Sequence, residues 1–353
     1  MTPSPREATG HSLLTATASV ICLLLAATLR LAHTDLAVWT TFLVMAQYTY
    51  TSFQKGFERV AGRGVGILAG LVLTTWFNDV PLVAFLLIGV LLTACFYIYF
   101  SGRLAYTALQ AGLYLVAVFQ IGRFSPETVE WESRELFAAI LVGVFVANIV
   151  NWLAGFEGDV SINLGDAPLF PVRTDWLNQS LMLAVTVLIT LVVAHLVDLP
   201  PTTAAISVLV LTISPHLQAL IQKGELRIAG LVLATLWSAA SFVLVGLLPH
   251  FPLLATFVFL GQFVATYLTL RGGTYSYAGL QMGLVLPMIA VAAPDDFGSL
   301  LPALQRLEGI LLGLGASVIV AGLWPRFPLA AAPPLPPPVP VSAPVAMPGE
   351  MDV

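Results

Sequence analysis

The sequence has very few charged side chains. Charged residues make up 9% of the 353 residues, whereas hydrophobic residues make up 58% and the mean hydropathy is +0.92. Soluble domains carry roughly 25% charged residues, so this chain cannot cover the surface of a water-soluble globule. Its apolar residues fall in runs of about twenty, the length that crosses a hydrocarbon core about 30 Å thick. The composition therefore predicts a polytopic membrane protein.

Positive charge, cysteine and catalytic motifs are also scarce. With 14 Lys and Arg against 19 Asp and Glu, the net charge is -5, which excludes nucleic-acid binding through a basic surface. Cys22 and Cys95 both lie in apolar runs, so we expect neither a disulfide framework nor a thiolate metal site. The sequence contains no HExxH or GxSxG motif and no intramembrane carboxylate pair. We expect a protein that is not an enzyme and that holds no metal or cofactor.

The apolar runs are continuous, which favours helices over the alternating strands of a membrane barrel. We predict an all-α fold with about twelve transmembrane helices. The expected spans are residues 13–31, 36–53, 60–77, 80–99, 104–121, 134–153, 177–197, 202–219, 228–247, 252–270, 274–292 and 306–324.

The distribution of basic residues predicts the orientation of these spans, because cytoplasmic loops carry an excess of Lys and Arg. If the N-terminus is cytoplasmic, the inner segments hold Arg6, Lys55, Arg59, Arg63, Arg103, Arg173, Lys223, Arg227, Arg271 and Arg326. The outer segments then hold only Arg30, Arg123, Arg134 and Arg306. We therefore expect both termini in the cytoplasm.

The chain reads as one six-helix unit written twice. Residues 54–62 (QKGFERVAG) recur as residues 222–230 (QKGELRIAG), and the Tyr-x-x-Leu-Gln-x-Gly pattern of residues 106–112 recurs at 277–283. Further matched pairs are Ser12 with Ser180, Arg134 with Arg306, and Trp152 with Trp324. Six spans is an even number, so the two copies are expected to be parallel repeats about an axis along the membrane normal.

Four segments follow from this repeat. Residues 1–155 form the first six-helix repeat and residues 176–327 the second. Residues 156–175 are acidic and read as a polar cytoplasmic linker. Residues 328–353 contain the run PPLPPPVP and are expected to form a disordered, proline-rich tail.

Small residues recur every fourth position in the third expected span, at Gly62, Gly66 and Gly70, and Gly230 is the counterpart of Gly62 in the ninth. Such a stripe lets helix backbones approach closely in a membrane, so we interpret these glycines as helix-packing residues. A nucleotide-binding loop is excluded, because no strand precedes the glycines and their spacing differs.

A basic pair at i,i+4 opens the third and ninth spans: Lys55 with Arg59, and Lys223 with Arg227. Two interpretations stay open. The pairs hold the helix ends in the cytosol, or they form a cationic vestibule that attracts organic anions.

Tyr106 with Gln110 and Tyr277 with Gln281 are a second set of i,i+4 pairs, inside the fifth and eleventh spans. A glutamine in hydrocarbon needs a hydrogen-bond partner, so these pairs either join helices or line a polar cavity for an aromatic ligand. His216 in the eighth span is a candidate for proton coupling, with an interfacial position as the alternative.

With these features the chain resembles the fusaric acid resistance / aromatic acid exporter superfamily, in its compact form without large cytosolic domains. The resemblance covers residues of about 10–327 and rests on the doubled six-span pattern and on the basic segment that opens each third helix. The family's R-x-x-G-T-x-x-G pattern is similar to Arg59-x-x-Gly62-Arg63-x-x-Gly66, with Arg63 in the place of threonine. In the second half Arg227-x-x-Gly230 is kept, and Leu231 follows.

The resemblance implies an efflux transporter of the bacterial inner membrane for small organic acids, above all aromatic ones. It also implies a small organic anion as substrate, contact with membrane lipid, and a periplasmic adaptor of the membrane-fusion type as a candidate partner. Assembly of several copies is left open. Two alternatives remain: an anion channel on the same scaffold, and a major-facilitator-like transporter, although the Asp of that family's loop between spans two and three is missing here.

Overall fold

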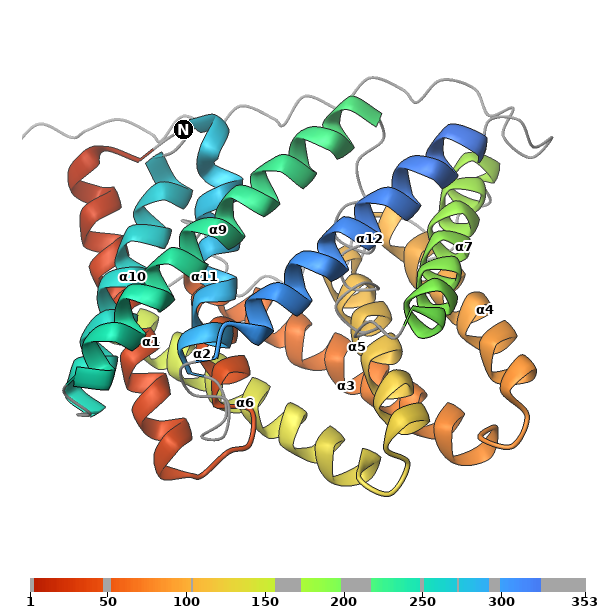
Figure 1. The fold of residues 1–353 in the computed structure, drawn as a ribbon, viewed down its shortest axis with the longest axis horizontal. Coiled ribbons are helices and arrows are strands. Elements are labelled where there is room, and N and C mark those ends of the chain that lie inside the picture. Colours follow the sequence, from red (N-terminus) through yellow and green to blue (C-terminus); the bar gives the residue numbers. More distant parts are fainter. Residues whose placement is uncertain are drawn as a thin grey trace, which may run out of the picture.

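The structure is a computed structural model of the chain, and it describes residues 3–46, 52–102, 104–155, 173–197, 217–247, 251–271, 273–291 and 299–324. In these ranges the regular structure consists of helices (Figure 1). They are α1 (Pro5–Thr28), α2 (Thr34–Met45), α3 (Ser52–Trp76), α4 (Pro81–Phe100), α5 (Ala105–Phe124), α6 (Val129–Leu153), α7 (Thr174–Leu196), α9 (Leu217–Leu247), α10 (Phe251–Arg271), the short 3-10 helix η1 (Gly273–Tyr275), α11 (Ser276–Ala290) and α12 (Leu301–Leu323).

Eight of the described helices are long and apolar enough to cross a membrane: α1, α4, α5, α6, α7, α9, α10 and α12. Of the other three α-helices, α2 is a shorter apolar helix of 12 residues and α11 has 15 residues. α3 has 25 residues, but its first half carries several charged side chains. The eighth expected span, 202–219, lies almost entirely outside the described residues. The all-helical membrane fold is confirmed, and the count of twelve spans remains a prediction.

Large apolar side chains cover much of the outer surface. Leu82 is 72% exposed, Leu68 65% and Val90 65%. Exposed apolar surface of this extent is unfavourable in water and is the surface that a lipid bilayer covers.

The helices of the first part of the chain pack in pairs that recur later. α3 packs along α5 and also contacts α6, α4 contacts α5, and α1 contacts α6. Under the offset of the sequence repeat the counterparts are α9 along α11, α9 with α12, α10 with α11, and α7 with α12, and all of these contacts are present.

Two contacts join the parts of the molecule that the repeat distinguishes. α1 packs against α10 at one edge, and α4 packs against α7 at the opposite edge (Figure 1). In the sequence repeat α1 corresponds to α7 and α4 corresponds to α10, so the two contacts are equivalent.

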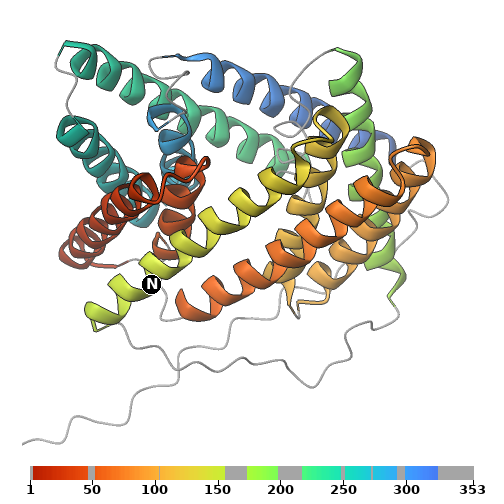
Figure 2. The ribbon, with the colours of Figure 1, turned by 90° about the horizontal axis from the view of Figure 1, so that it is seen from below.

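The short helix α2 lies between both parts. Leu36 and Ala37 of α2 belong to a buried cluster with α1, α3, α5 and α6. Val38 and Phe42 of the same helix belong to a second buried cluster, formed with α9, α10, α11 and α12. A third cluster joins α4 and α5 to α7. Figure 2 shows α3 and α6 running next to each other on the face opposite α9 and α12.

α3 and α5 approach each other at the glycine stripe. A Cβ atom on Gly62 would lie 2.9 Å from Cβ of Gln110 and would overlap the carbonyl oxygen of Thr107. One on Gly66 would overlap the carbonyl oxygen of Ala111, and one on Gly70 would lie 2.7 Å from Cβ of Val118.

α9 and α11 make the corresponding approach. There, a Cβ atom on Gly230 would lie 2.5 Å from the carbonyl oxygen of Ala278 and 2.6 Å from Cβ of Gln281. Tyr106 and Gln110 of α5 thereby lie near Arg59 and Arg63 of α3, and Tyr277 of α11 lies near Arg227 of α9.

Candidate functional site

Four arginines are buried among the described residues: Arg59 and Arg63 on α3, Arg227 on α9 and Arg306 on α12. They are between 1% and 6% exposed. Placing an arginine at the centre of a membrane helix costs about 3 kcal/mol on insertion scales, so such residues mark functional sites. They form two groups, which we call the first and the second arginine centre.

The first arginine centre lies between α2, α3 and α5. The guanidinium of Arg63 donates from Nε to Oε1 of Gln110 (2.9 Å) and from Nη1 to Oγ1 of Thr40 (3.1 Å). It also lies over the rings of Tyr114 (4.7 Å to the centroid) and Trp39 (5.7 Å). Rings at this distance attract a cation through their negative faces.

Arg59 lies one helical turn before Arg63 in the same centre. Its Nη1 donates to the carbonyl oxygen of Thr40 (3.3 Å), and its guanidinium lies 5.4 Å from the ring centroid of Tyr106. Its Nε has no hydrogen-bond partner. Thr40 therefore accepts hydrogen bonds from both arginines, one through its backbone and one through its side chain.

The second arginine centre lies between α9, α11 and α12, and it is less completely bonded. Arg227 is buried, and within the described residues its Nε and Nη1 and the Nε of Arg306 have no hydrogen-bond partner. Nη1 of Arg306 contacts Sδ of Met288 at 3.1 Å, and a thioether is a weak acceptor. Arg306 interacts electrostatically with Arg227 and with Tyr277.

Two polar groups on α11 lie near this centre. The hydroxyl of Tyr277 interacts with the guanidinium of Arg227. Oε1 of Gln281, on a side chain that is 2% exposed and packs against Gly230, has no hydrogen-bond partner among the described residues.

Asp35 is the carboxylate that interacts with both centres. It lies in the first turn of α2 and interacts electrostatically with Arg306 of the second centre and with Tyr114, which contacts Arg63 in the first. No ion pair within 4 Å joins Asp35 to an arginine in the described part of the chain; the pairs there are His33 with Glu132, Arg134 with Glu130, and Arg173 with Asp175.

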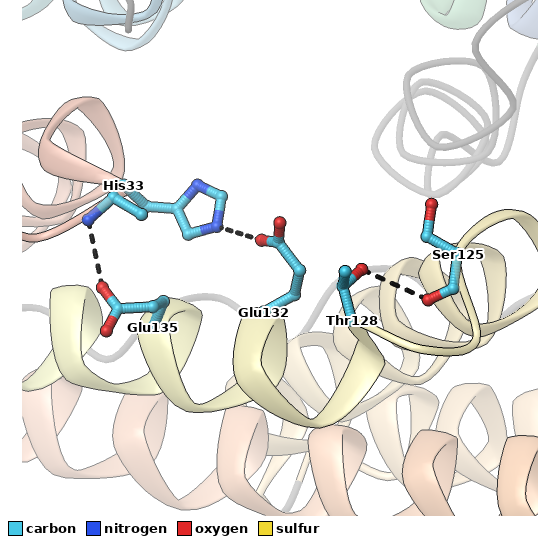
Figure 3. Close-up of polar contacts among 6 residues, drawn as sticks. His33, Ser125, Thr128, Glu132 and Glu135 are labelled. Carbon is cyan, nitrogen blue, oxygen red and sulfur yellow. Dashed lines mark hydrogen bonds and ion pairs between the residues drawn. The ribbon is translucent and has the colours of Figure 1, made fainter.

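A polar cluster fixes the start of α2 and therefore the position of Asp35. Nε2 of His33 lies 2.8 Å from Oε2 of Glu132, and the backbone N–H of Ala32 donates to Oε2 of Glu135 at 3.0 Å (Figure 3). His33 and Glu132 are about a quarter exposed. These contacts tie the connection between α1 and α2 to the first turns of α6.

The charges of the two centres do not balance. Four guanidinium groups are buried, and among the described residues the carboxylate of Asp35 interacts electrostatically with one of them, that of Arg306. Burial of unpaired charge is unfavourable by several kcal/mol per ion. An anion that enters this region gains the attraction that the protein itself leaves unused.

A hollow of about 430 Å³ opens beside the second arginine centre. It lies at the connection between α10 and α11, close to the end of α2, and Tyr277 forms part of its wall. Ala46, Thr269, Thr274 and Ser276 line it as well. A second hollow of about 620 Å³ lies between α4 and α7; its lining is almost entirely apolar and suits lipid rather than an anion.

The structure brings most of the residues predicted from sequence together. Arg59 meets Tyr106, and Gln110 lies beside both Gly62 and Arg63. In the second centre Tyr277 interacts with Arg227, and Gln281 packs against Gly230.

Other predicted residues are placed differently or lie outside the description. Arg59 and Arg227 are each 2% exposed, so they do not line a wet vestibule; the close helix pairs cover them. Lys223 is half-buried. The side chain of Lys55 and the whole of His216 lie outside the described residues.

Three residues of the site were not predicted. Arg306 was assigned to an outer segment, and it is buried because α12 packs against α9 and places its side chain beside Met288 of α11. Its repeat counterpart Arg134 pairs with Glu130 at the surface. In the sequence, Arg63 is one of the inner basic residues and a departure from the family pattern, and Asp35 is an acid at the start of an apolar run.

Membrane-length helices arranged around buried arginines indicate a polytopic membrane protein with a functional site among its helices. Residues 20–150 match the family model described as fusaric acid resistance protein-like. Residues 178–323 match the model described as aromatic acid exporter family member 1. The chain therefore belongs to the fusaric acid resistance / aromatic acid exporter superfamily, whose families act in membrane efflux. Searches of curated proteins and of solved structures found no match.

Proposed function

We propose that the chain is an efflux transporter of the bacterial inner membrane for small organic acids, above all aromatic ones. The observation that carries this proposal is the buried positive charge of the described residues: four arginines are buried there, and Asp35 acts on one of them, Arg306, without a direct ion pair. An organic anion supplies the missing negative charge, and its carboxylate can accept two N–H groups of one guanidinium.

An aromatic side chain at the second centre supports the aromatic part of the proposal. Tyr277 interacts with Arg227 and lines the hollow beside the second centre, so its ring can contact an aromatic substrate there. Aromatic rings pack against one another in offset or edge-to-face arrangements, which adds about 0.5–1.5 kcal/mol to the burial of apolar surface.

The proposed architecture is twelve helices in two parallel six-helix repeats, with both termini in the cytoplasm. The recurring helix pairs support it, as do the paired contacts of α1 with α10 and α4 with α7. In this orientation the hollow beside Tyr277 opens toward the cytoplasm, from which an exporter must load. Residues 156–175 would connect the repeats, and residues 328–353 would form a cytoplasmic tail.

The membrane potential can drive such export without a coupled proton. Moving one negative charge out of an inside-negative cell gains about 2.3 kcal/mol per 100 mV. At about 1.4 kcal/mol per tenfold ratio, this sustains a concentration ratio of roughly fifty-fold. A periplasmic adaptor of the membrane-fusion type would then carry the released acid further.

The test is transport by the purified full chain in liposomes. Vesicles are loaded with benzoate, a potassium gradient with valinomycin sets the potential, and benzoate release is followed after dilution. We expect release that saturates with benzoate concentration and that reverses its dependence on potential when the gradient is reversed.

Two results would count against the proposal. A single-channel current carried by small inorganic anions, without saturation, would make the chain an anion channel. Equal release from vesicles that lack the protein would remove the transport activity altogether. Benzamide, which has the same ring and no charge, serves as the matched control substrate and should not be transported faster than by empty vesicles.

A further inference from the structure

We infer that the two arginine centres have different roles: the second centre binds the carboxylate of the substrate, and the first is a closed structural contact. This inference rests on the proposed function and specifies which of the two centres holds the anion. It follows from the hydrogen-bond partners of the four buried arginines.

The first centre has little capacity left for a ligand. Arg63 donates hydrogen bonds to Gln110 and Thr40, and the rings of Trp39 and Tyr114 lie near its guanidinium group. These partners leave little room for a ligand around the guanidinium. Arg59 donates to the Thr40 carbonyl and lies over Tyr106, which leaves Nε as its unpartnered atom. An anion that entered here would have to displace these partners.

The second centre, in contrast, has hydrogen-bond donors that are available to a ligand. Among the described residues, Nε and Nη1 of Arg227 and Nε of Arg306 are buried donors without an acceptor. A buried unsatisfied polar group costs about 1–3 kcal/mol, and more when it is charged. A carboxylate that accepts a hydrogen bond from any of these donors removes part of this cost.

Repulsion between the guanidinium groups of Arg227 and Arg306 also favours anion binding at the second centre. Arg227 and Arg306 interact electrostatically, and their like charges raise each other's energy while both remain buried. An anion between or beside them removes this repulsion. Asp35 acts on Arg306 from a longer distance than an ion pair, so it offsets only part of the charge.

The sequence differences between the repeats explain the asymmetry. Arg63, which fills the first centre, is replaced by Leu231 at the matching position of the second. Conversely, Arg306 reaches the second centre from α12, whereas its counterpart Arg134 is bound to Glu130 at the surface. Each centre therefore has two arginines. In the first centre both are on α3, and Thr40 and Gln110 provide acceptors for them. In the second centre one arginine is on α9 and the other on α12.

The hollow at the connection between α10 and α11 adjoins the second centre at Tyr277, although Arg227 and Arg306 are not among the residues that line it. Tyr277 lines this hollow and interacts electrostatically with both Arg227 and Arg306. A volume of about 430 Å³ falls in the range of small-molecule sites, so a benzoate-sized acid fits there.

The test compares matched arginine variants in the purified full chain. Benzoate affinity is measured by titration calorimetry in detergent, and thermal stability is measured on the same samples without benzoate. Arg227→Gln and Arg306→Gln should each weaken benzoate binding by about tenfold or more, because each removes a charged donor of the carboxylate. Arg306→Lys should recover part of the affinity, because the charge returns without the planar fork.

Two further variants serve as comparisons. Arg63→Gln should lower the thermal stability more than it lowers the affinity, because Gln110 and Thr40 lose their donor. Arg134→Gln, the repeat counterpart of Arg306 at the surface, should change neither quantity. All variants are compared only when they elute as monodisperse protein.

The outcomes separate this inference from the proposed function. Transport with a loss of affinity in Arg63→Gln and none in Arg227→Gln or Arg306→Gln would overturn the inference and leave the function standing. Benzoate binding lost in Arg306→Gln, without transport by the wild-type chain, would uphold the site and overturn the function. If the wild-type chain neither binds nor transports benzoate, benzamide being the reference, both are wrong.

Discussion

The burial of Arg306 depends on the residues around it rather than on its position in the sequence repeat. It and Arg134 occupy matching positions in the sequence repeat, yet Arg306 is 6% exposed and Arg134 is paired at the surface. The difference lies in what surrounds each residue: Glu130 one turn before Arg134 offers a partner in water, whereas Met288 and Arg227 surround Arg306.

Asp35 gives a residue-scale prediction with a definite sign. Its carboxylate is the negative charge that acts on Arg306, so it competes with an incoming anion. Asp35→Asn should therefore tighten benzoate binding several-fold, corresponding to about 1 kcal/mol for a charge pair beyond contact distance in a partly polar interior.

The measurement is the same calorimetric titration, with Asp175→Asn as the control. Asp175 is bound to Arg173 near the start of α7, so its replacement should leave benzoate affinity unchanged. Weaker binding in Asp35→Asn would show that the carboxylate orients Arg306 for the ligand rather than competing with it.

At this scale the sequence draws attention to residues that recur at a fixed offset, and it gives no reason to single out Asp35. Arg59, Tyr106, Gln110 and their counterparts stand out because each occurs twice at a fixed offset. Asp35 occurs once, and its importance depends on α2 lying between two groups of helices, which only the tertiary packing determines.

The pairing of α3 with α5 gives a prediction at the scale of the element. A Cβ atom at Gly66 would overlap the backbone of Ala111 and lie 3.0 Å from the amide nitrogen of Leu115. Backbone cannot move aside as a side chain can, so Gly66→Ala should lower the stability of the folded protein by about 2 kcal/mol or more.

Gly64 is the matched control on the same helix. A Cβ atom there would lie 3.5 Å from the ring of Phe137, which is ordinary contact. Gly64→Ala should raise stability by about 0.5–1 kcal/mol, because alanine restricts the unfolded chain. Thermal unfolding in detergent measures both. Equal effects of the two changes would mean that α3 and α5 are not held together at the glycine stripe.

The four-residue spacing of Gly62, Gly66 and Gly70 was sufficient to predict a packing face, but not its partner. The spacing identifies the face of α3 that lacks side chains and so allows another helix to approach closely. That α5 rather than a neighbouring copy lies against it follows from contacts distant in the chain, such as Gly70 with Val118.

The orientation of the whole molecule can be tested independently of its activity. We expect reporter fusions after Gly155 and at the C-terminus to be active only as cytosolic reporters, because the predicted inner segments hold most of the Lys and Arg. A fusion after Asp79, in the connection between α3 and α4, should be active only as a periplasmic reporter. Reversal at any of these points would refute the predicted number of spans before it.

At the scale of the molecule, composition and hydropathy were enough to predict an all-helical membrane protein. They did not predict the lengths of the helices well, because α2 is shorter and α9 longer than the expected spans. Hydropathy registers how apolar a segment is, whereas helix length follows from tilt and from where neighbouring helices end.

The position of α2 restricts how the transporter can move. Phe42 of α2 lies on Gly283 of α11, where a Cβ atom would overlap its ring, while Ala37 of α2 meets Gly143 of α6. Two six-helix units that rock as rigid bodies would have to separate one of these contacts in every cycle. The alternative is that α2 behaves as a pivot, which stays in place while the outer helices turn around it. Because α2 carries Asp35 and Thr40, a fixed α2 would hold these contacts to both arginine centres constant during the conformational change.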